Sequence, residues 1–245
     1  MENRQKRKNR LPLILIVSNI GCEERKDLQK MFPAGSACVV TASELNKTFK
    51  TAVSFDRFGS SEIALEGAKI AANQITGVIS TISNFLPQEF FYIDPTDREY
   101  VCAETNAFFT YFLSELSCKK VNPPSPRSLS GYYLHPVEWA QIAMDHHVPV
   151  RPVIMKNGIL TVADQLNLGQ PLRATMVGER MIEKDIPESV QHYMSVLSKT
   201  FEMPYLSCFF VPHQKPGEYF LVDISFIPDI SSPGHREAIV SFLTL

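Results

Sequence analysis

The sequence predicts an α/β protein made of two lobes. From residue 11 to about residue 135, short apolar runs rich in β-branched residues alternate with stretches of helical spacing, which is the pattern of βαβ units. From residue 136 the pattern changes to a helix, a hairpin, a second helix and two further strands. With 245 residues, of which 44% are hydrophobic, the chain is long enough to bury a sizeable core.

The first lobe alternates strand and helix in chain order. We expect strands at 13–17, 37–41 and 77–82, a short helix at 24–31, a capping turn at 43–45, a helix at 61–74 and a long helix at 97–116. The helix at 61–74 is expected because Ile63, Leu65, Ala68 and Ile70 recur at helical spacing. Ser61 would cap this helix rather than bind a phosphate, since every free helix start needs a cap.

The second lobe follows a proline-rich connection. Pro123, Pro124 and Pro126 deny helix to this stretch and favour an extended link between lobes. Beyond it we expect a helix at 139–147, a strand at 148–152, a hairpin at 173–182, a helix at 187–199, strands at 207–211 and 219–225, and a final helix at 235–245. Gly178 can adopt the positive φ that the hairpin turn requires.

The first ten residues carry an unusual charge. Five of them are basic, so residues 1–10 are expected to form a solvated tail ahead of lobes at 11–135 and 136–245. The apolar run that follows has the length of a strand and ends at Ser18 and Asn19 without a cleavage site, which favours a first strand over a signal peptide. We therefore expect a cytoplasmic protein with no membrane span.

Composition narrows the classes of partner. A net charge of −2 argues against nucleic-acid binding by the protein as a whole. The five cysteines lack metal-site spacing and are expected to be reduced and mostly buried; Cys22 is the one thiol worth testing, because it precedes a short helix. The expected partners are a small molecule, a peptide or a protein, and the chain could form homo-oligomers.

Candidate ligand-binding residues lie where strands end, the usual place for ligands in open α/β sheets. Ser18 and Asn19 follow the first strand, Asn122 follows the strand near 121, and Asp223 and Ser225 lie at the end of the last strand. Each has a structural alternative, since Asn is a common turn former and Asn122 could equally satisfy backbone groups. Asp223 and Asp229 form at best a weak acid/base pair, and the histidines show no metal-site spacing.

Several segments, in their order along the chain, resemble the ATP-grasp fold in its glutathione synthetase and ribosomal-protein glutamate ligase branch. They are residues 97–109, similar to a "D-x-x-Y-x-x-E-x-x-A" helix start, and residues 118–124, 139–152, 172–182 and 218–234. The resemblance implies a Rossmann-like N-terminal lobe of the pre-ATP-grasp type and a partial ATP-grasp α+β C-terminal lobe. It also implies that Arg173 corresponds to the arginine that contacts phosphate.

The sequence departs from this family in two ways. Family members carry a lobe with two ATP-binding lysines and a glycine-rich loop, whereas here only Val153 to Pro171 fills that interval, with the single lysine Lys156. We therefore expect a truncated chain without an antiparallel nucleotide lid. The family's magnesium-binding "E-x-N" corresponds to Asp223 and Ser225, with no carboxylate on the preceding strand, so Asp223 alone would be a weak metal ligand.

These observations favour a degenerate, non-catalytic protein that binds a small molecule, peptide or protein between its lobes without a cofactor. A triphosphate is costly to bury against a single arginine. One alternative is an ATP-dependent carboxylate–amine ligase that uses ATP and Mg²⁺, with lysines from a partner subunit or with Lys156. Another alternative is a structural docking subunit of a biosynthetic complex.

Overall fold

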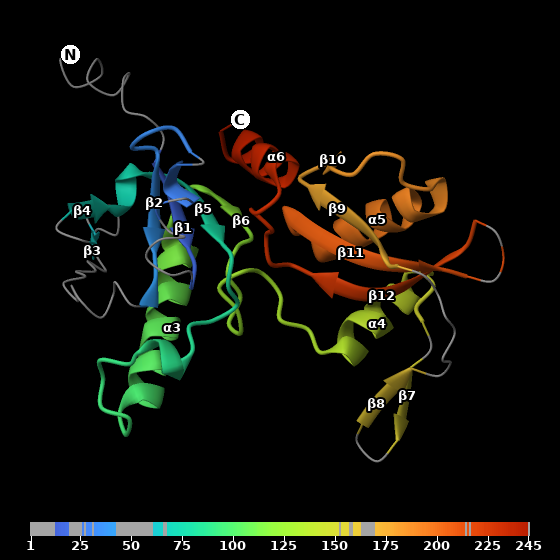
Figure 1. Ribbon diagram of the computed structural model, residues 1–245, viewed down its shortest axis with the longest axis horizontal. Coiled ribbons are helices and arrows are strands. Elements are labelled where there is room, and N and C mark those ends of the chain that lie inside the picture. Colours follow the sequence, from blue (N-terminus) through green and yellow to red (C-terminus); the bar gives the residue numbers. More distant parts are fainter. Residues whose placement is uncertain are drawn as a thin grey trace. The chain divides into compact units, whose positions relative to one another are not determined.

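The computed structural model describes residues 13–19, 26, 28–30, 32–42, 61–65, 68–151, 153–156, 159–162, 170–213, 215 and 217–244 (Figure 1). The chain divides into two compact units, Met1–Gly131 with Val240–Leu245, and Tyr132–Ile239. One four-stranded sheet is entirely parallel and another is antiparallel. The expected α/β class is thereby confirmed.

The first unit is organised around the parallel sheet. Its order is β2-β1-β5-β6, formed by β2 (Ala37–Val40), β1 (Leu13–Val17), β5 (Ile75–Ser80) and β6 (Lys119–Val121). The strands predicted at 13–17, 37–41 and 77–82 are confirmed. Their continuous apolar runs are typical of parallel strands, which are covered on both faces.

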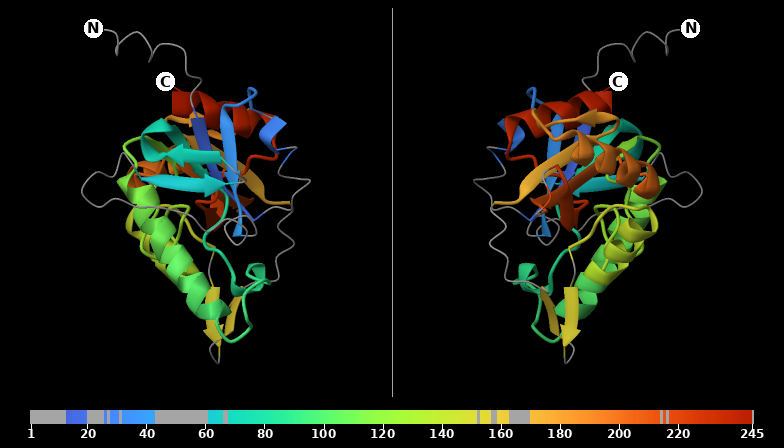
Figure 2. Two further views of the ribbon diagram at one scale, coloured as in Figure 1. Left: turned by 90° about the vertical axis from the view of Figure 1, so that its left-hand side faces the viewer. Right: turned by 90° about the vertical axis from the view of Figure 1, so that its right-hand side faces the viewer.

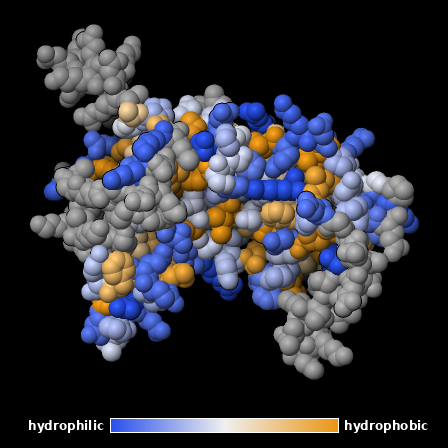
Figure 3. All heavy atoms as spheres, viewed as in Figure 1, coloured by the Kyte–Doolittle hydropathy of each residue, from blue (hydrophilic) through white to orange (hydrophobic). Residues whose placement is uncertain are grey.

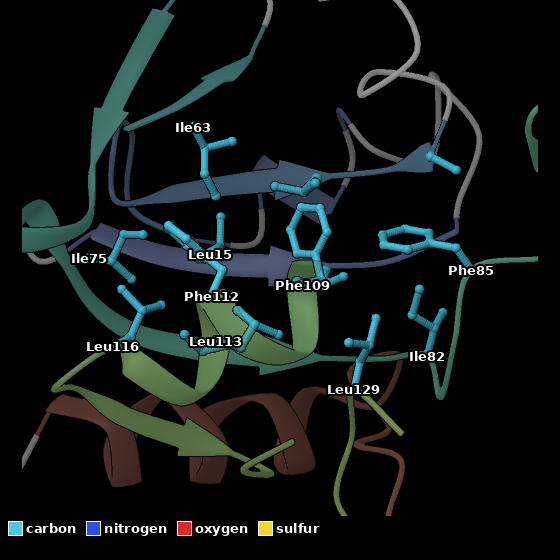
Figure 4. Close-up of a cluster of buried hydrophobic side chains, with 14 of the residues drawn as sticks. Leu15, Ile63, Ile75, Ile82, Phe85, Phe109, Phe112, Leu113, Leu116 and Leu129 are labelled. Carbon is cyan, nitrogen blue, oxygen red and sulfur yellow. The ribbon is translucent and has the colours of Figure 1, made fainter. Parts of the chain in front are cut away.

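One face of this sheet is covered by α3 (Arg98–Glu115), which begins after Asp97 as predicted. Phe109, Phe112 and Leu113 of α3 pack in one cluster with residues of β1 and β5, as Figure 4 shows. The end of α6 (Pro233–Thr244) approaches β5 at Gly77, where a Cβ atom would lie 3.3 Å from the Leu243 side chain. Glycine at position 77 therefore allows this close packing.

The helix predicted at 61–74 is wrong. The structure has an antiparallel hairpin of β3 (Glu62–Leu65) and β4 (Ala68–Ala71), followed by the short 3-10 helix η3 (Ala72–Gln74), and Figure 2 shows the hairpin. Ile63 and Ile70 are opposite each other in the hairpin, and their separation of seven also suits a helix, so spacing alone does not distinguish the two. Gly67 between the runs was the turn signal.

The prediction of Ser61 as a helix cap falls with that helix. Ser61 is buried, and its carbonyl accepts a hydrogen bond from the Ala72 N–H at 2.7 Å. Within the predicted helix at 24–31, residues 28–30 are helical. The predicted turn at 43–45, the basic tail and Cys22 lie outside the described residues. A further 3-10 helix, η4 (Pro87–Glu89), leads toward α3.

The second unit contains the antiparallel sheet in the order β10-β9-β11-β12. Its strands are β9 (Leu172–Val177), β10 (Arg180–Met181), β11 (Tyr205–Pro212) and β12 (Tyr219–Ser225). The hairpin turn has Gly178 at a φ of 59°, as predicted. The predicted helices are confirmed as α4 (Pro136–Asp145), α5 (Glu188–Phe201) and α6. The predicted strand at 148–152 is reduced to one parallel bridge between Val150 and Leu221.

The interval expected to be too short for an antiparallel lid forms a hairpin. It consists of β7 (Val153–Lys156) and β8 (Ile159–Val162) paired antiparallel. The interval thus does contain antiparallel strands, while the expected absence of a phosphate-cradling loop stays a prediction. Two apolar runs separated by Asn157-Gly158 are a strong sequence signal for a hairpin. The numbers of lysines and glycines in the interval do not bear on whether such a hairpin forms.

Among the described residues, no helix is both long enough and apolar enough to cross a membrane.

Candidate functional site

The antiparallel sheet of the second unit has one apolar and one polar face. Cross-strand neighbours point to the same face. Ala174 and Cys208 are neighbours and pack with α4 and α5 in the core. The opposite face carries two rows of neighbours, Arg173–Phe209–Asp223 and Thr175–Ser207–Ser225, together with Tyr205. We call these seven residues the polar face.

Arg173 is held in a fixed orientation on the polar face. Its Nε donates to Ser207 Oγ at 2.9 Å, its Nη1 to Asp229 Oδ2 at 2.7 Å, and its Nη2 to the Tyr205 hydroxyl at 2.9 Å. The guanidinium also lies 5.9 Å from the centroid of the Phe209 ring. A guanidinium bonded through three nitrogen atoms is pre-organised to recognise an anion.

Two further ionisable residues, Glu183 and His235, lie next to these contacts. The Glu183 carboxylate accepts hydrogen bonds from Thr175 N at 2.6 Å and from Thr175 Oγ1 at 2.8 Å. It also lies 3.0 Å from His235 Nε2. The other ring nitrogen of His235, Nδ1, is 3.6 Å from Asp229 Oδ2. Glu183, His235, Asp229 and Arg173 thus form a continuous chain of ionisable groups.

The surroundings fix the protonation of Asp229, Arg173 and Tyr205. Burial alone would raise the pKa of Asp229, but hydrogen bonds from Ser231 and Arg173 hold this pKa well below its ordinary value. Burial alone would lower the pKa of Arg173, but Asp229 and Tyr205 raise it. Burial raises the pKa of Tyr205. At neutral pH, Asp229 and Arg173 are therefore charged and Tyr205 is neutral.

Asp223 and Ser225 lie at the end of β12 and point to the polar face. Asp223 is exposed, and its Oδ1 accepts from Ile224 N at 2.9 Å. Ser225 Oγ accepts from Ile227 N at 3.3 Å. Among the described residues, no group of three or more His, Cys, Asp and Glu side chains could hold a metal ion. A cation at Asp223 would therefore need further oxygen ligands from a bound molecule.

The other predicted site residues lie in the first unit. Ser18, Asn19 and Asn122 follow β1 and β6, which both pair with β5 in the parallel sheet, so all three lie at its carboxyl edge. Asn19 is exposed, whereas Ser18 and Asn122 are buried, and Ser18 N donates to Val40 O at 2.9 Å. The six predicted residues therefore form two groups, one in each unit.

Most of the residues that surround Arg173 were not predicted from the sequence. Tyr205 and Ser207 could have been found from the alternation along β11, which places them on the same face as Arg173. Asp229 was considered only as a partner of Asp223, whereas the structure pairs it with Arg173. Glu183 and His235 are 52 residues apart, and no local pattern connects them.

The sequence and the fold can be compared with those of known proteins. No protein-family model matches the sequence, and no curated protein matches it. The macrocyclase MdnC of Microcystis aeruginosa MRC, solved with the precursor peptide MdnA, has a TM-score of 0.71 at 13% identity over 93% of this chain and 98% of that chain.

Two further solved structures are similar. A RiPP-associated ATP-grasp ligase of Chryseobacterium gregarium, in complex with ADP and a leader and core peptide, has a TM-score of 0.68 at 13% identity over 96% of this chain and 97% of that chain. The ATP-grasp ligase PsnB was solved in complex with a phosphomimetic variant of a minimal precursor, Mg and ADP. It has a TM-score of 0.67 at 12% identity over 96% of this chain and 99% of that chain.

Sequence identities of 12–13% support a conclusion about the fold alone. The alignments extend over at least 97% of each solved chain, so the expectation of a truncated chain is wrong. The resemblance to the ATP-grasp fold that the sequence indicates is confirmed. The protein has the ATP-grasp fold.

Proposed function

We propose that this protein is an ATP-grasp ligase that joins a carboxylate to an amine on a peptide substrate, using ATP and Mg²⁺. The observation that carries the proposal is the row Arg173–Phe209–Asp223, which puts a fixed guanidinium and an exposed carboxylate on one sheet face with one residue between them. Similar solved structures hold ADP and peptides. We therefore prefer a ligase to the degenerate, non-catalytic protein that the sequence favours.

In this proposal the two lobes have separate tasks. Residues 11–135 form the Rossmann-like lobe of the pre-ATP-grasp type and would contribute to substrate binding through Asn19 at the carboxyl edge of its parallel sheet. Residues 136–245 form the ATP-grasp lobe and would bind the nucleotide on the polar face. The β7–β8 hairpin would contribute to a small lid, because it occupies the interval in which the family carries its lid.

The residues of the polar face fit a magnesium nucleotide. Arg173 has five N–H groups, of which three donate within the chain, so two remain for a phosphate. Magnesium typically takes one or two carboxylates together with substrate phosphates, which suits the exposed Asp223 with Ser225 beside it. Bound ATP would supply the energy to activate the carboxylate, while Arg173 directly, and Asp223 through Mg²⁺, would orient the phosphate groups of ATP.

A non-catalytic binding protein is the second candidate. It is favoured by the internal pairing of Arg173 with Asp229 at 2.7 Å and by the single acid on β12, which leave little positive charge for a triphosphate. In that case the protein would bind a peptide, a small molecule or a protein partner without ATP. Nucleotide binding distinguishes the two candidates.

The test is calorimetric titration of ATP with Mg²⁺ into the purified protein. Micromolar binding that is lost in Arg173→Ala and Asp223→Ala supports the ligase. Lys199→Ala and Asp145→Ala are matched controls, since both residues are exposed and lie on α5 and α4, which pack against the apolar face of the sheet. Absence of heat at millimolar nucleotide would overturn the ligase and leave the binding protein.

A further inference from the structure

Asp229 occupies the arginine that the proposed function assigns to phosphate. Its Oδ2 accepts from Arg173 Nη1 at 2.7 Å, while its Oδ1 accepts from Ser231 N at 2.9 Å and from Ser231 Oγ at 2.6 Å. Its own backbone N–H donates to the Tyr205 hydroxyl at 3.2 Å. A carboxylate of the chain therefore takes the place of an external anion on Arg173.

His235 lies on the other side of this carboxylate. The residue is 5% exposed, and its Nδ1 is the buried side-chain atom without a hydrogen-bond partner in the part of the chain that the structure describes. Leaving such a group unpaired is unfavourable, by about 1–3 kcal/mol. The 3.6 Å between Nδ1 and Asp229 Oδ2 exceeds a charge-assisted hydrogen bond by less than about 1 Å. A small shift of Asp229 would complete this bond.

We propose that Asp229 determines the affinity and selectivity of the polar face for phosphate, by occupying Arg173 when no ligand is bound and moving to His235 when a phosphate group binds Arg173. The inference rests on the proposed function. In the exchange, the Arg173–Asp229 hydrogen bond breaks, a hydrogen bond from His235 Nδ1 to Asp229 forms, and the freed guanidinium N–H donates to phosphate. Only an anion that binds Arg173 more strongly than a carboxylate can displace Asp229.

Two carboxylates face the His235 ring. The groups that face it are Glu183 from the segment after β10, Asp229 from the segment after β12, and Arg173 behind Asp229 on β9. Its neighbour Arg236 on α6 donates to Ile230 O at 2.9 Å instead. An imidazolium that has taken one proton from solvent can donate to Glu183 and Asp229 together. His235 can therefore hold the displaced Asp229 without releasing Glu183.

The test is titration of ADP with Mg²⁺ into the full-length protein and two variants. Asp229→Asn removes the competing charge, so ADP should bind at least about tenfold more tightly. His235→Gln removes the imidazole that would donate to the displaced Asp229, so ADP should bind more weakly. In the double variant the effect of His235→Gln should disappear, because no charged carboxylate remains to be accommodated. Asp145→Asn, an exposed position, is the matched control for charge.

The outcomes separate this inference from the proposed function. If the wild-type protein binds ADP, tighter binding in Asp229→Asn supports the inference. If the wild-type protein binds ADP, loses it in Arg173→Ala, and shows unchanged or weaker binding in Asp229→Asn, the inference is overturned while the proposed function stands. If neither the wild type nor Asp229→Asn binds ADP, both fail. Should Asp229→Asn unfold, ADP binding to His235→Gln that is as tight as in the wild type overturns the inference by itself.

Discussion

The two regions that hold the predicted site residues differ in charge. The carboxyl edge of the parallel sheet presents neutral hydroxyl and amide groups at Ser18, Asn19 and Asn122, two of them buried. The polar face of the antiparallel sheet, with Glu183, Asp229 and His235 against it, places ionisable groups within 4 Å of one another. The first region suits uncharged groups of a substrate, whereas only the second is equipped for an anion.

Their stabilities should also depend on different forces. Neutral buried groups contribute through hydrogen bonds that salt does not screen, whereas charge pairs that are partly exposed respond to ionic strength and pH. Surface residues near either region should contribute little. Four measurements test this difference, in order of decreasing expected effect.

The largest loss of stability is expected from Glu183→Ala. Thr175 N and Thr175 Oγ1 would lose their acceptor, and the buried His235 would lose its neighbour, at a cost of about 3 kcal/mol in the free energy of unfolding. Urea denaturation measures this cost. Glu179→Ala, at an exposed turn position, should cost less than about 0.5 kcal/mol. Equal effects of the two variants would show that Glu183 is not part of a buried network.

Tyr205→Phe should have the next largest effect. The hydroxyl accepts from Arg173 Nη2 and from Asp229 N, so its removal should cost about 2 kcal/mol. The same change at the exposed Tyr100 provides the control and should be close to neutral. If thermal denaturation shows no difference between the two variants, Tyr205 does not fix Arg173 as described.

At the neutral edge, Asn122→Ala should cost about 1–2 kcal/mol, because the Asn122 side chain is fully buried and alanine would leave part of its volume empty. This cost should be the same in low and high salt, since no charge is involved. Asn19→Ala, exposed at the same edge, should leave stability within about 0.5 kcal/mol of the wild type. A cost at Asn122 that depends on salt would remove the distinction between the two regions.

The smallest effect concerns acid. The pKa of Asp229 in the folded protein lies below its ordinary value of 3.8, so its ionised form stabilises the fold at pH values above about 3.8, and this contribution is lost as the pH falls further. The difference in unfolding free energy between wild type and Asp229→Asn should be constant from about pH 5 to pH 7 and should shrink below about pH 4. A difference that grows in acid would contradict the lowered pKa.

The sequence predicted the elements whose signals are local and unambiguous. The strand at Leu13–Val17 is a continuous β-branched run, the hairpin turn at Gly178 needs a positive φ, and the helix after Asp97 is long. The helix predicted at 61–74 is wrong because Ile63 and Ile70 fit a helix and a hairpin equally well. The hairpin at 153–162 was not predicted, although the dipeptide Asn157-Gly158 between two apolar runs favours a hairpin turn.

The candidate site divides in the same way. Asp223 and Ser225 were selected by their places at a strand end, and Arg173 by the family resemblance. Alternation along the strands explains why these three side chains share a face. Whether Arg173 is free or paired could not be read from the chain, since Asp229, Glu183 and His235 come from separate segments. Contacts between distant segments depend on how strands pair and loops return, and only the tertiary structure decides those.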